Sequence, residues 1–160
     1  MSTGVKKLQE EYKFIRKSGI LATVGGSCCP VNKTDFLHWY GCILGPKNTP
    51  YAGGTYYFEM KFTNEYPNKG PIDVRMKTPT YHPNINSSNG HICVQYFSGW
   101  KNTNDVAGIV TTIFDLLNNP NPASSYNSTD TSKSADFNRR YANENQKFDW
   151  NNSWDKGWIN

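Results

Sequence analysis

The chain has 160 residues, a formal net charge of +4 and 19% charged residues. This length is typical of one domain, and an aromatic content of 14% supplies enough large apolar surface to exclude a disordered chain. The net charge is too small for the dense basic surface of most nucleic-acid-binding proteins, so we expect no nucleic-acid partner. No segment approaches the roughly 20 apolar residues of a membrane span, so we expect no membrane partner and a cytoplasmic or nuclear location.

The cysteines could indicate a metal site or a disulfide framework, and there are four of them: Cys28, Cys29, Cys42 and Cys93. Their spacing contains no Cys-x-x-Cys pair, which is the common zinc-ligand pattern. It also differs from the dense, paired cysteines of small secreted domains. We therefore expect reduced thiols, with no metal site and no cofactor.

The first predicted element is a helix over residues 5–15. Its apolar residues recur at steps of three and four: Val5, Leu8, Tyr12 and Ile15. Charged residues occupy the other faces, so the pattern predicts an amphipathic helix that ends near residues 18–19, Ser-Gly. Residues 21–31, which follow, are small and rich in Gly, Cys and Pro.

Three segments in the middle of the chain predict strands that form a meander. Residues 35–44 are an apolar run closed by the turn composition Gly-Pro-Lys-Asn at 45–48. Residues 55–62 alternate strictly, which predicts a half-buried antiparallel strand. Its apolar face consists of Tyr56, Phe58, Met60 and Phe62. Residues 72–77 alternate again and predict a shorter strand toward the edge of the sheet.

Residues 79–101 are rich in Pro, Asn, Ser and Gly, with only a brief apolar run at 92–97. This composition predicts a long, largely irregular segment. Loops of such length in a compact domain are usually functional, so we expect the functional site here.

Two helices are predicted after this segment. The first has a buried stripe consisting of Val106, Ile109, Val110, Ile113, Leu116 and Leu117. Asn104 or Asp105 is placed to cap its first turn, and Asn119-Pro120 is placed to end it. The second is expected from about residue 134 to residue 148, with Phe137, Tyr141 and Phe148 facing inward.

Short motifs occur in a fixed order along most of the chain. In and after the long segment they are Tyr81-His82-Pro83-Asn84-Ile85-Asn86, Gly90-His91-Ile92-Cys93-Val94, Trp100 and Asn119-Pro120-Asn121-Pro122. Before it they include Phe36-Leu37-His38-Trp39, Pro50-Tyr51-Ala52-Gly53-Gly54 and Tyr66-Pro67, and near the end Phe137-Asn138-Arg139. In their joint order, from about residue 5 to residue 148, these motifs resemble the ubiquitin-conjugating enzyme family.

The resemblance implies an α+β fold with an N-terminal helix, a four-stranded antiparallel meander sheet, a long active-site loop, and central and C-terminal helices. It implies one catalytic domain over residues 1–150 and a short tail over 151–160. Its partners would be ubiquitin, an activating enzyme, a ligase and a protein substrate. Trp150, Trp154 and Trp158 would share a face if the tail were helical, but poor helix formers between them favour irregular packing on the body.

Cys93 occupies the position of the family's acceptor cysteine, which takes ubiquitin as a thioester and passes it on. A thiolate is a strong nucleophile, and exchange of one thioester for another needs mainly access and positioning. From the residues alone, a buried structural cysteine between Ile92 and Val94 is the alternative. His91 lies two residues before Cys93. Because the family uses no base there, we favour a solvated loop histidine over a catalytic one.

The other site residues also follow from the resemblance. Asn84 would stabilise the oxyanion formed when a lysine attacks, or would support the active-site loop. His82, through a buried imidazole hydrogen bond, and Pro83 would support that loop structurally. Ser124 matches a family position that guides the incoming lysine, and an ordinary loop serine is the alternative.

Residues that would contact the activating enzyme and the ligase lie in the first helix and in two loops: Lys6, Lys7, Lys13, Asn68 and Asn102. For the lysines, a solvated helix face is the alternative. The large apolar anchor common at the position of Asn68 is missing, which puts pairing with common RING ligases in doubt.

The active-site loop departs from the family pattern in its spacing. Cys93 follows Asn84 by nine residues, one more than the common spacing. The turn at residues 87–90, which ends in Asn-Gly, is able to absorb the extra residue. The main prediction is a ubiquitin-conjugating enzyme. The alternatives are a non-catalytic scaffold that binds ubiquitin or a partner enzyme, and a conjugating enzyme for a ubiquitin-like modifier.

Overall fold

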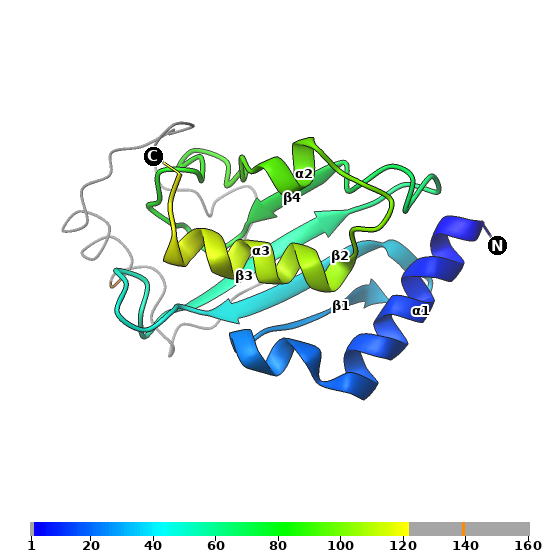
Figure 1. Ribbon diagram of the computed structural model, residues 1–160, viewed down its shortest axis with the longest axis horizontal. Helices are drawn as coiled ribbons and strands as arrows, with labels where there is room; N and C mark the ends of the chain where they lie inside the picture. Colours follow the sequence, from blue (N-terminus) through cyan, green and yellow to red (C-terminus); the bar gives the residue numbers. More distant parts are fainter. Residues whose placement is uncertain (1, 122–138, 140–160) are drawn as a thin grey trace.

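The computed structural model describes residues 2–121 and residue 139. Within these residues three α-helices, one short 3-10 helix and four strands follow one another (Figure 1). In chain order they are α1 (Thr3–Ser18), η1 (Ile20–Val24), β1 (Ser27–Asn32), β2 (Asp35–Leu44), β3 (Thr55–Lys61), β4 (Asp73–Met76), α2 (Gln95–Ser98) and α3 (Val106–Asn118). The predicted final helix and the Trp-containing tail lie outside the described residues, apart from Arg139, which is helical.

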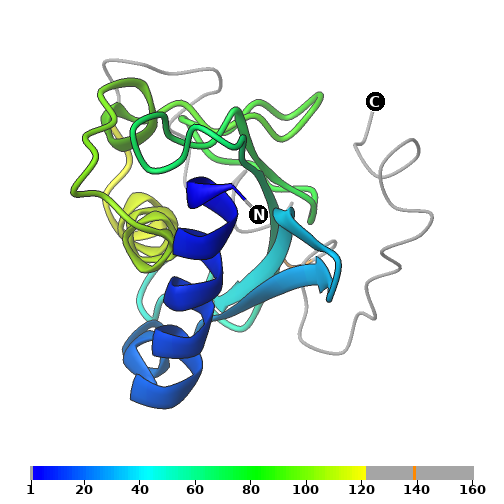
Figure 2. The same ribbon diagram turned by 90° about the vertical axis from the view of Figure 1, so that its right-hand side faces the viewer.

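The four strands form one antiparallel sheet in the order β1-β2-β3-β4. This arrangement confirms the predicted meander and places β4 at an edge. Figure 2 shows α1 and α3 on the same face of the sheet. The local sequence did not identify β1, which contains Pro30 and small residues. It forms by pairing along β2, at an edge position where a proline is tolerated.

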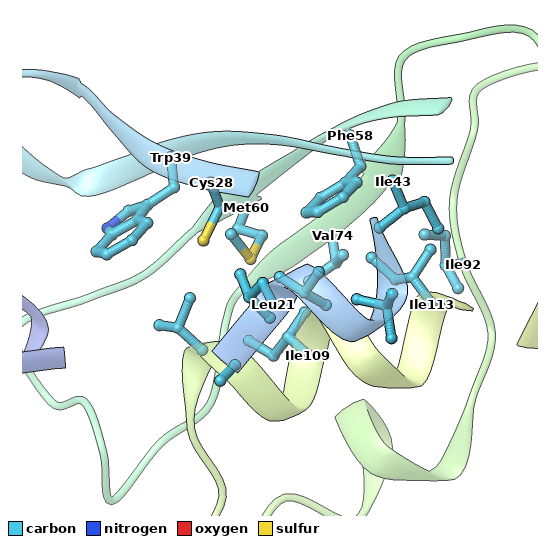
Figure 3. Packing of buried hydrophobic residues seen from close by; sticks show 14 of the residues in the cluster. Leu21, Cys28, Trp39, Ile43, Phe58, Met60, Val74, Ile92, Ile109 and Ile113 are labelled. Atoms are coloured by element: carbon cyan, nitrogen blue, oxygen red, sulfur yellow. The ribbon is translucent and has the colours of Figure 1, made fainter. Parts of the chain in front are cut away.

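The core lies between the sheet and the helices (Figure 3). Tyr56, Phe58 and Met60 of β3 are fully buried, as the alternation predicts, and Ile109 and Ile113 of α3 belong to the same cluster. Burial of the apolar side chains among them, such as Phe58 and Ile109, stabilises the fold by roughly 1.5–3 kcal/mol each. The core thereby holds the sheet and α3 together, and the long loop packs against them.

The opposite face of β3 is less exposed than the alternation alone suggests. Glu59 is only 3% exposed and its carboxylate lies 2.8 Å from Nε2 of His38. The ammonium of the fully buried Lys77 lies 3.7 Å from the same carboxylate. Opposite charges that lie close together offset part of the cost of burial, which explains how a polar position of the pattern is buried.

The helix ends follow their capping residues. Ser2 caps α1 by accepting the Val5 N–H at 3.1 Å, and Gly19 ends it with φ 64°. Asp105, rather than Asn104, caps α3, since its carboxylate accepts the Gly108 N–H at 2.7 Å. All six apolar residues of the predicted α3 stripe are buried. Across the described part of the chain, no helix combines the length and the apolar character needed to cross a bilayer.

Candidate active site

His82 lies near the start of the long loop, and its imidazole is completely buried. Its Nε2 lies 2.7 Å from the carbonyl oxygen of Leu116 in α3, and its Nδ1 accepts the Asn84 N–H at 3.0 Å. Since Nδ1 accepts, Nε2 carries the proton and donates to Leu116. Burial lowers the pKa of His82 to about 4, so the ring is neutral at pH 7. This imidazole joins the start of the loop to the last turns of α3.

Asn84 connects the loop to the segment that follows α3. Its Nδ2 donates to the carbonyl oxygen of Asn121 at 2.6 Å, and its Oδ1 accepts the Asn121 N–H at 2.7 Å. Asn84 is fully buried. Because both polar atoms of the carboxamide bind one backbone unit, the side chain is held in a single orientation. Nothing in the sequence singles out Asn121 as its partner.

Cys93 lies directly beside Asn84. Its N–H donates to the Asn84 carbonyl oxygen at 3.0 Å. The preceding residue, Ile92, is 2% exposed and forms an isolated bridge with Ile85, whereas Cys93 and His91 are exposed. This alternation places the side chains of Cys93 and His91 on the same, outward side of the chain. Cys93 is therefore accessible, and the buried side chain of Ile92 holds the backbone next to it.

The turn that precedes Cys93 is closed locally. Asn86 and Asn89 each accept a backbone N–H two residues ahead, at 2.8 and 2.9 Å. Gly90 has φ 78°, a left-handed conformation that glycine adopts without strain. The Met76 N–H donates to the Gly90 carbonyl oxygen at 2.8 Å. The turn thus accommodates the extra residue between Asn84 and Cys93, while its last residue remains hydrogen-bonded to β4.

A surface groove with a volume of about 210 Å³ adjoins Cys93. It lies between β4 and α2, and Cys93, His91 and Asp73 contribute its polar side. Apolar side chains from Ile72 and Phe97 also line it. Ile72 is 66% exposed, which is high for a large apolar residue. The exposed Cys93 thus lines a partly apolar depression.

The other cysteines lie in the sheet. Cys28 is buried, and burial raises the pKa of its thiol to about 12. Burial also raises the pKa of the Cys29 and Cys42 thiols. A raised pKa lowers the fraction of reactive thiolate. Of these three, only Cys29 is exposed, which makes it a useful comparison for Cys93. Within residues 2–121 and at residue 139, no group of three or more potential metal ligands occurs.

The remaining predicted site residues are placed as follows. Pro83 is buried between His82 and Asn84. The predicted contact residues Lys6, Lys7, Lys13, Asn68 and Asn102 are all exposed. Ser124 lies outside the described residues.

The three segments that carry the predicted contact residues are tied together. Trp100 donates from Nε1 to the Pro67 carbonyl oxygen at 2.8 Å. This hydrogen bond joins the loop that carries Asn68 to the loop that carries Asn102. The Tyr66 hydroxyl donates to the carboxylate of Glu11 in α1 at 2.6 Å. In Figure 1 these loops lie near the N-terminal end of α1.

Glu11 is a buried carboxylate that the sequence analysis did not single out. It accepts the Tyr66 hydroxyl and also the Val106 N–H, at 2.8 Å. Burial raises its pKa, although these hydrogen bonds lower it in part. Its position between Leu8 and Ile15, on the buried stripe of α1, was a usable signal in the sequence.

Comparison with known proteins identifies this arrangement. The family model described as Ubiquitin-conjugating enzyme matches residues 7–149. The chain belongs to the ubiquitin-conjugating enzyme family. It is 40% identical over 129 residues to Ubiquitin-conjugating enzyme E2 3 of Arabidopsis thaliana, covering 79% of this chain and 82% of that protein. It is 38% identical to Ubiquitin-conjugating enzyme E2 2 of Saccharomyces cerevisiae, covering 79% and 72%.

A solved structure agrees with the fold. The crystal structure of a Plasmodium yoelii protein, provisionally assigned as a ubiquitin conjugating enzyme, superposes with a TM-score of 0.77. The match covers 89% of this chain and 97% of that one, at 24% sequence identity. The predictions of the family, of the α+β fold and of a ubiquitin-conjugating function are confirmed.

Proposed function

We propose that this ubiquitin-conjugating enzyme accepts ubiquitin from an activating enzyme as a thioester on Cys93 and transfers it to a substrate lysine or a ligase cysteine. The observation that carries the proposal is the exposed Cys93 thiol on a backbone held by Asn84 and Ile92. Thioester exchange requires an accessible, well-positioned sulfur, and this loop provides one. We include a cytoplasmic or nuclear location in the proposal.

We propose that His82, Pro83 and Asn84 position Cys93. The His82 imidazole fixes the loop to α3, and the Asn84 carboxamide fixes it to Asn121. Of the two roles expected for Asn84, the geometry supports loop support, because its Nδ2 and Oδ1 both bind Asn121. We retain Ser124 as the residue that guides the incoming lysine.

We propose that the activating enzyme and the ligase bind the surface of α1 and the two loops that Trp100 joins. Lys6, Lys7 and Lys13 supply positive charge along α1. Asn68 and Asn102 supply polar side chains from the loops. Since interfaces depend on a few large anchors, a ligase for this chain would have to gain affinity from contacts other than one at Asn68.

A charging assay tests the proposal. The full chain is incubated with an activating enzyme, ATP and ubiquitin, and the products are separated with and without reductant. We expect a reductant-sensitive ubiquitin adduct in the wild type and none in Cys93→Ala. Cys93→Ser should give either an adduct that survives reductant, because an oxyester replaces the thioester, or none. Cys29→Ala is the matched control and should charge like the wild type, since it removes the other exposed cysteine.

Failure would be informative. A reductant-sensitive adduct that persists in Cys93→Ala would place the acceptor elsewhere. If folded wild-type protein gave no adduct with ubiquitin, the assay would be repeated with ubiquitin-like modifiers and their own activating enzymes. Charging with one of those modifiers would show that the chain carries that modifier and not ubiquitin. No charging with any of them would favour a non-catalytic scaffold.

A further inference from the structure

His91, expected from the sequence to be a solvated loop residue, lines the same groove as Cys93. Both side chains leave the chain on its exposed side, because the intervening Ile92 points into the core. Any group that attacks a thioester on Cys93 from this groove passes the imidazole. This placement follows from burial and from the groove lining, which the sequence does not display.

Edge strand β4 holds His91 in place. The backbone of His91 forms a bridge with Arg75, and the Ile92 N–H approaches the Val74 carbonyl oxygen at 3.4 Å. The Asp73 carboxylate faces the imidazole, with 4.0 Å between Oδ1 and the Nδ1 of His91. Asp73 is itself fixed by Arg75, whose Nε lies 2.7 Å from Oδ2. The 4.0 Å between Asp73 and His91 is too long for a hydrogen bond, so the carboxylate acts on the imidazole through its charge, and Nδ1 is the ring nitrogen nearer to it.

We propose that His91, with the Asp73 carboxylate beside its ring, is the proton acceptor for the substrate lysine, an inference that rests on the proposed thioester at Cys93. A lysine side chain is charged at neutral pH and is nucleophilic only after it loses a proton. His91 takes this proton from the lysine ammonium at Nε2. The Asp73 carboxylate stabilises the resulting imidazolium, and Arg75 offsets part of that effect. The groove wall formed by Ile72 and Phe97 would hold the aliphatic stem of the lysine.

The bond changes balance without a further reagent. The neutral amine attacks the thioester carbonyl carbon, a carbon–nitrogen bond forms, and the carbon–sulfur bond breaks. The Cys93 sulfur leaves with the electron pair and takes the second proton from the nitrogen. The products are an isopeptide and a free thiol, and His91 returns its proton to water. A positioned base of this kind contributes about a hundredfold or more in rate.

The test compares two nucleophiles in single-turnover discharge of preformed Cys93–ubiquitin thioester. Free lysine needs a base, whereas hydroxylamine is uncharged at neutral pH and needs none. For His91→Gln we expect lysine discharge to fall by about a hundredfold or more, with hydroxylamine discharge within about twofold of the wild type. Asp73→Asn should slow lysine discharge by a smaller factor and also leave hydroxylamine discharge unchanged. His38→Gln is the matched control, because His38 lies on β2 and does not line the groove.

The possible results separate this inference from the proposed function. Wild-type protein that forms no thioester on Cys93 would overturn the proposed function. If the His91→Gln variant carries ubiquitin as a thioester and transfers it to lysine at the wild-type rate, the role of His91 is overturned and the proposed function stands. Equal slowing with both nucleophiles would also overturn it, since that result indicates a displaced loop rather than a missing base.

Discussion

The carboxylate of Glu11 in α1 accepts a hydrogen bond from the N–H of Val106, the first residue of α3, at 2.8 Å. An N–H in the first turn of a helix has no partner within the helix, and the helix dipole favours a negative charge at this end. The same carboxylate accepts the Tyr66 hydroxyl. One buried side chain therefore joins α1, α3 and the segment that leads into the proposed partner surface.

Glu11→Ala should destabilise the protein far more than Glu11→Gln. The alanine variant leaves the Tyr66 hydroxyl and the Val106 N–H buried without their acceptor, at a cost of about 1–3 kcal/mol each. Glutamine keeps an acceptor oxygen and removes the buried charge, so we expect a change within about 1 kcal/mol of the wild type. Chemical denaturation at pH 7 measures both, and an alanine variant as stable as the glutamine variant would contradict the linking role.

The same pair of proteins should differ in how stability depends on pH. The pKa of Glu11 is raised in the folded state, so the folded protein binds more protons than the unfolded chain just above pH 4.5. The contribution of Glu11 is therefore present at low pH and is lost as the pH rises through its folded pKa. Glu11→Gln removes this term. Its unfolding free energy should rise relative to the wild type between pH 4.5 and pH 7, and a constant difference would contradict the raised pKa.

His82 should affect the pH dependence of stability in the opposite direction to Glu11. Its pKa falls from 6.5 to about 4 on folding, so the unfolded chain binds the proton more readily. Its contribution is present above pH 6.5 and is lost as the pH falls toward 4, amounting to about 3 kcal/mol in total. Denaturation of the Glu11→Gln variant across this range follows the effect without the contribution of Glu11. The NMR shift of the His82 ring protons provides a direct check, since a ring half-protonated at pH 6.5 would be inconsistent with the buried geometry.

Asn84→Ala should form the Cys93 thioester at close to the wild-type rate and transfer it to lysine more slowly. The substitution removes both hydrogen bonds to Asn121 but keeps the backbone contact between Asn84 and Cys93. We expect lysine transfer to fall by about tenfold to a hundredfold, because small displacements of reacting groups are costly. We also expect a stability loss of about 1–3 kcal/mol.

Single-turnover charging and discharge, measured separately, test this prediction for Asn84. A variant that folds but no longer charges would show that Asn84 is needed before transfer. An Asn84→Ala protein with unchanged stability and slowed transfer would instead favour an oxyanion role over loop support.

The fold was largely predictable because its signals are local. The alternation in β3 and the apolar stripe of α3 both report which side chains face the core. β1 escaped local prediction, since its residues form a strand only by pairing with β2. Its assignment depended on the resemblance to a family with four strands.

The site was predictable only in part, for a physical reason. Cys93, Asn84 and His82 belong to ordered motifs and could be singled out by position. Their partners could not, because Asn121 and Leu116 act through backbone atoms, which carry no sequence signal. Nor could the sequence place Asp73 against His91, a contact that depends on the register between β4 and the loop.

Gly70→Ala should impair charging without affecting the chemistry at Cys93. A Cβ at Gly70 would lie 2.6 Å from ring atoms of Trp100, so the ring must move and its hydrogen bond to Pro67 weakens. Overpacking of this kind costs about 1–3 kcal/mol. Because Trp100 joins the two loops of the proposed partner surface, we expect charging by the activating enzyme to slow by about fivefold or more. Lysine discharge of the preformed thioester should stay within about twofold of the wild type.

Gly53→Ala provides the matched control for Gly70→Ala. A Cβ at Gly53 meets nothing within 4 Å, but its φ of 83° strains alanine by about 1–2 kcal/mol. It lies in the turn between β2 and β3, at the opposite end of the molecule from the start of α1 (Figure 1). Comparable destabilisation with normal charging in Gly53→Ala would assign the defect of Gly70→Ala to the displaced loops. Equal loss of charging in both variants would assign it to reduced stability and contradict the proposed surface.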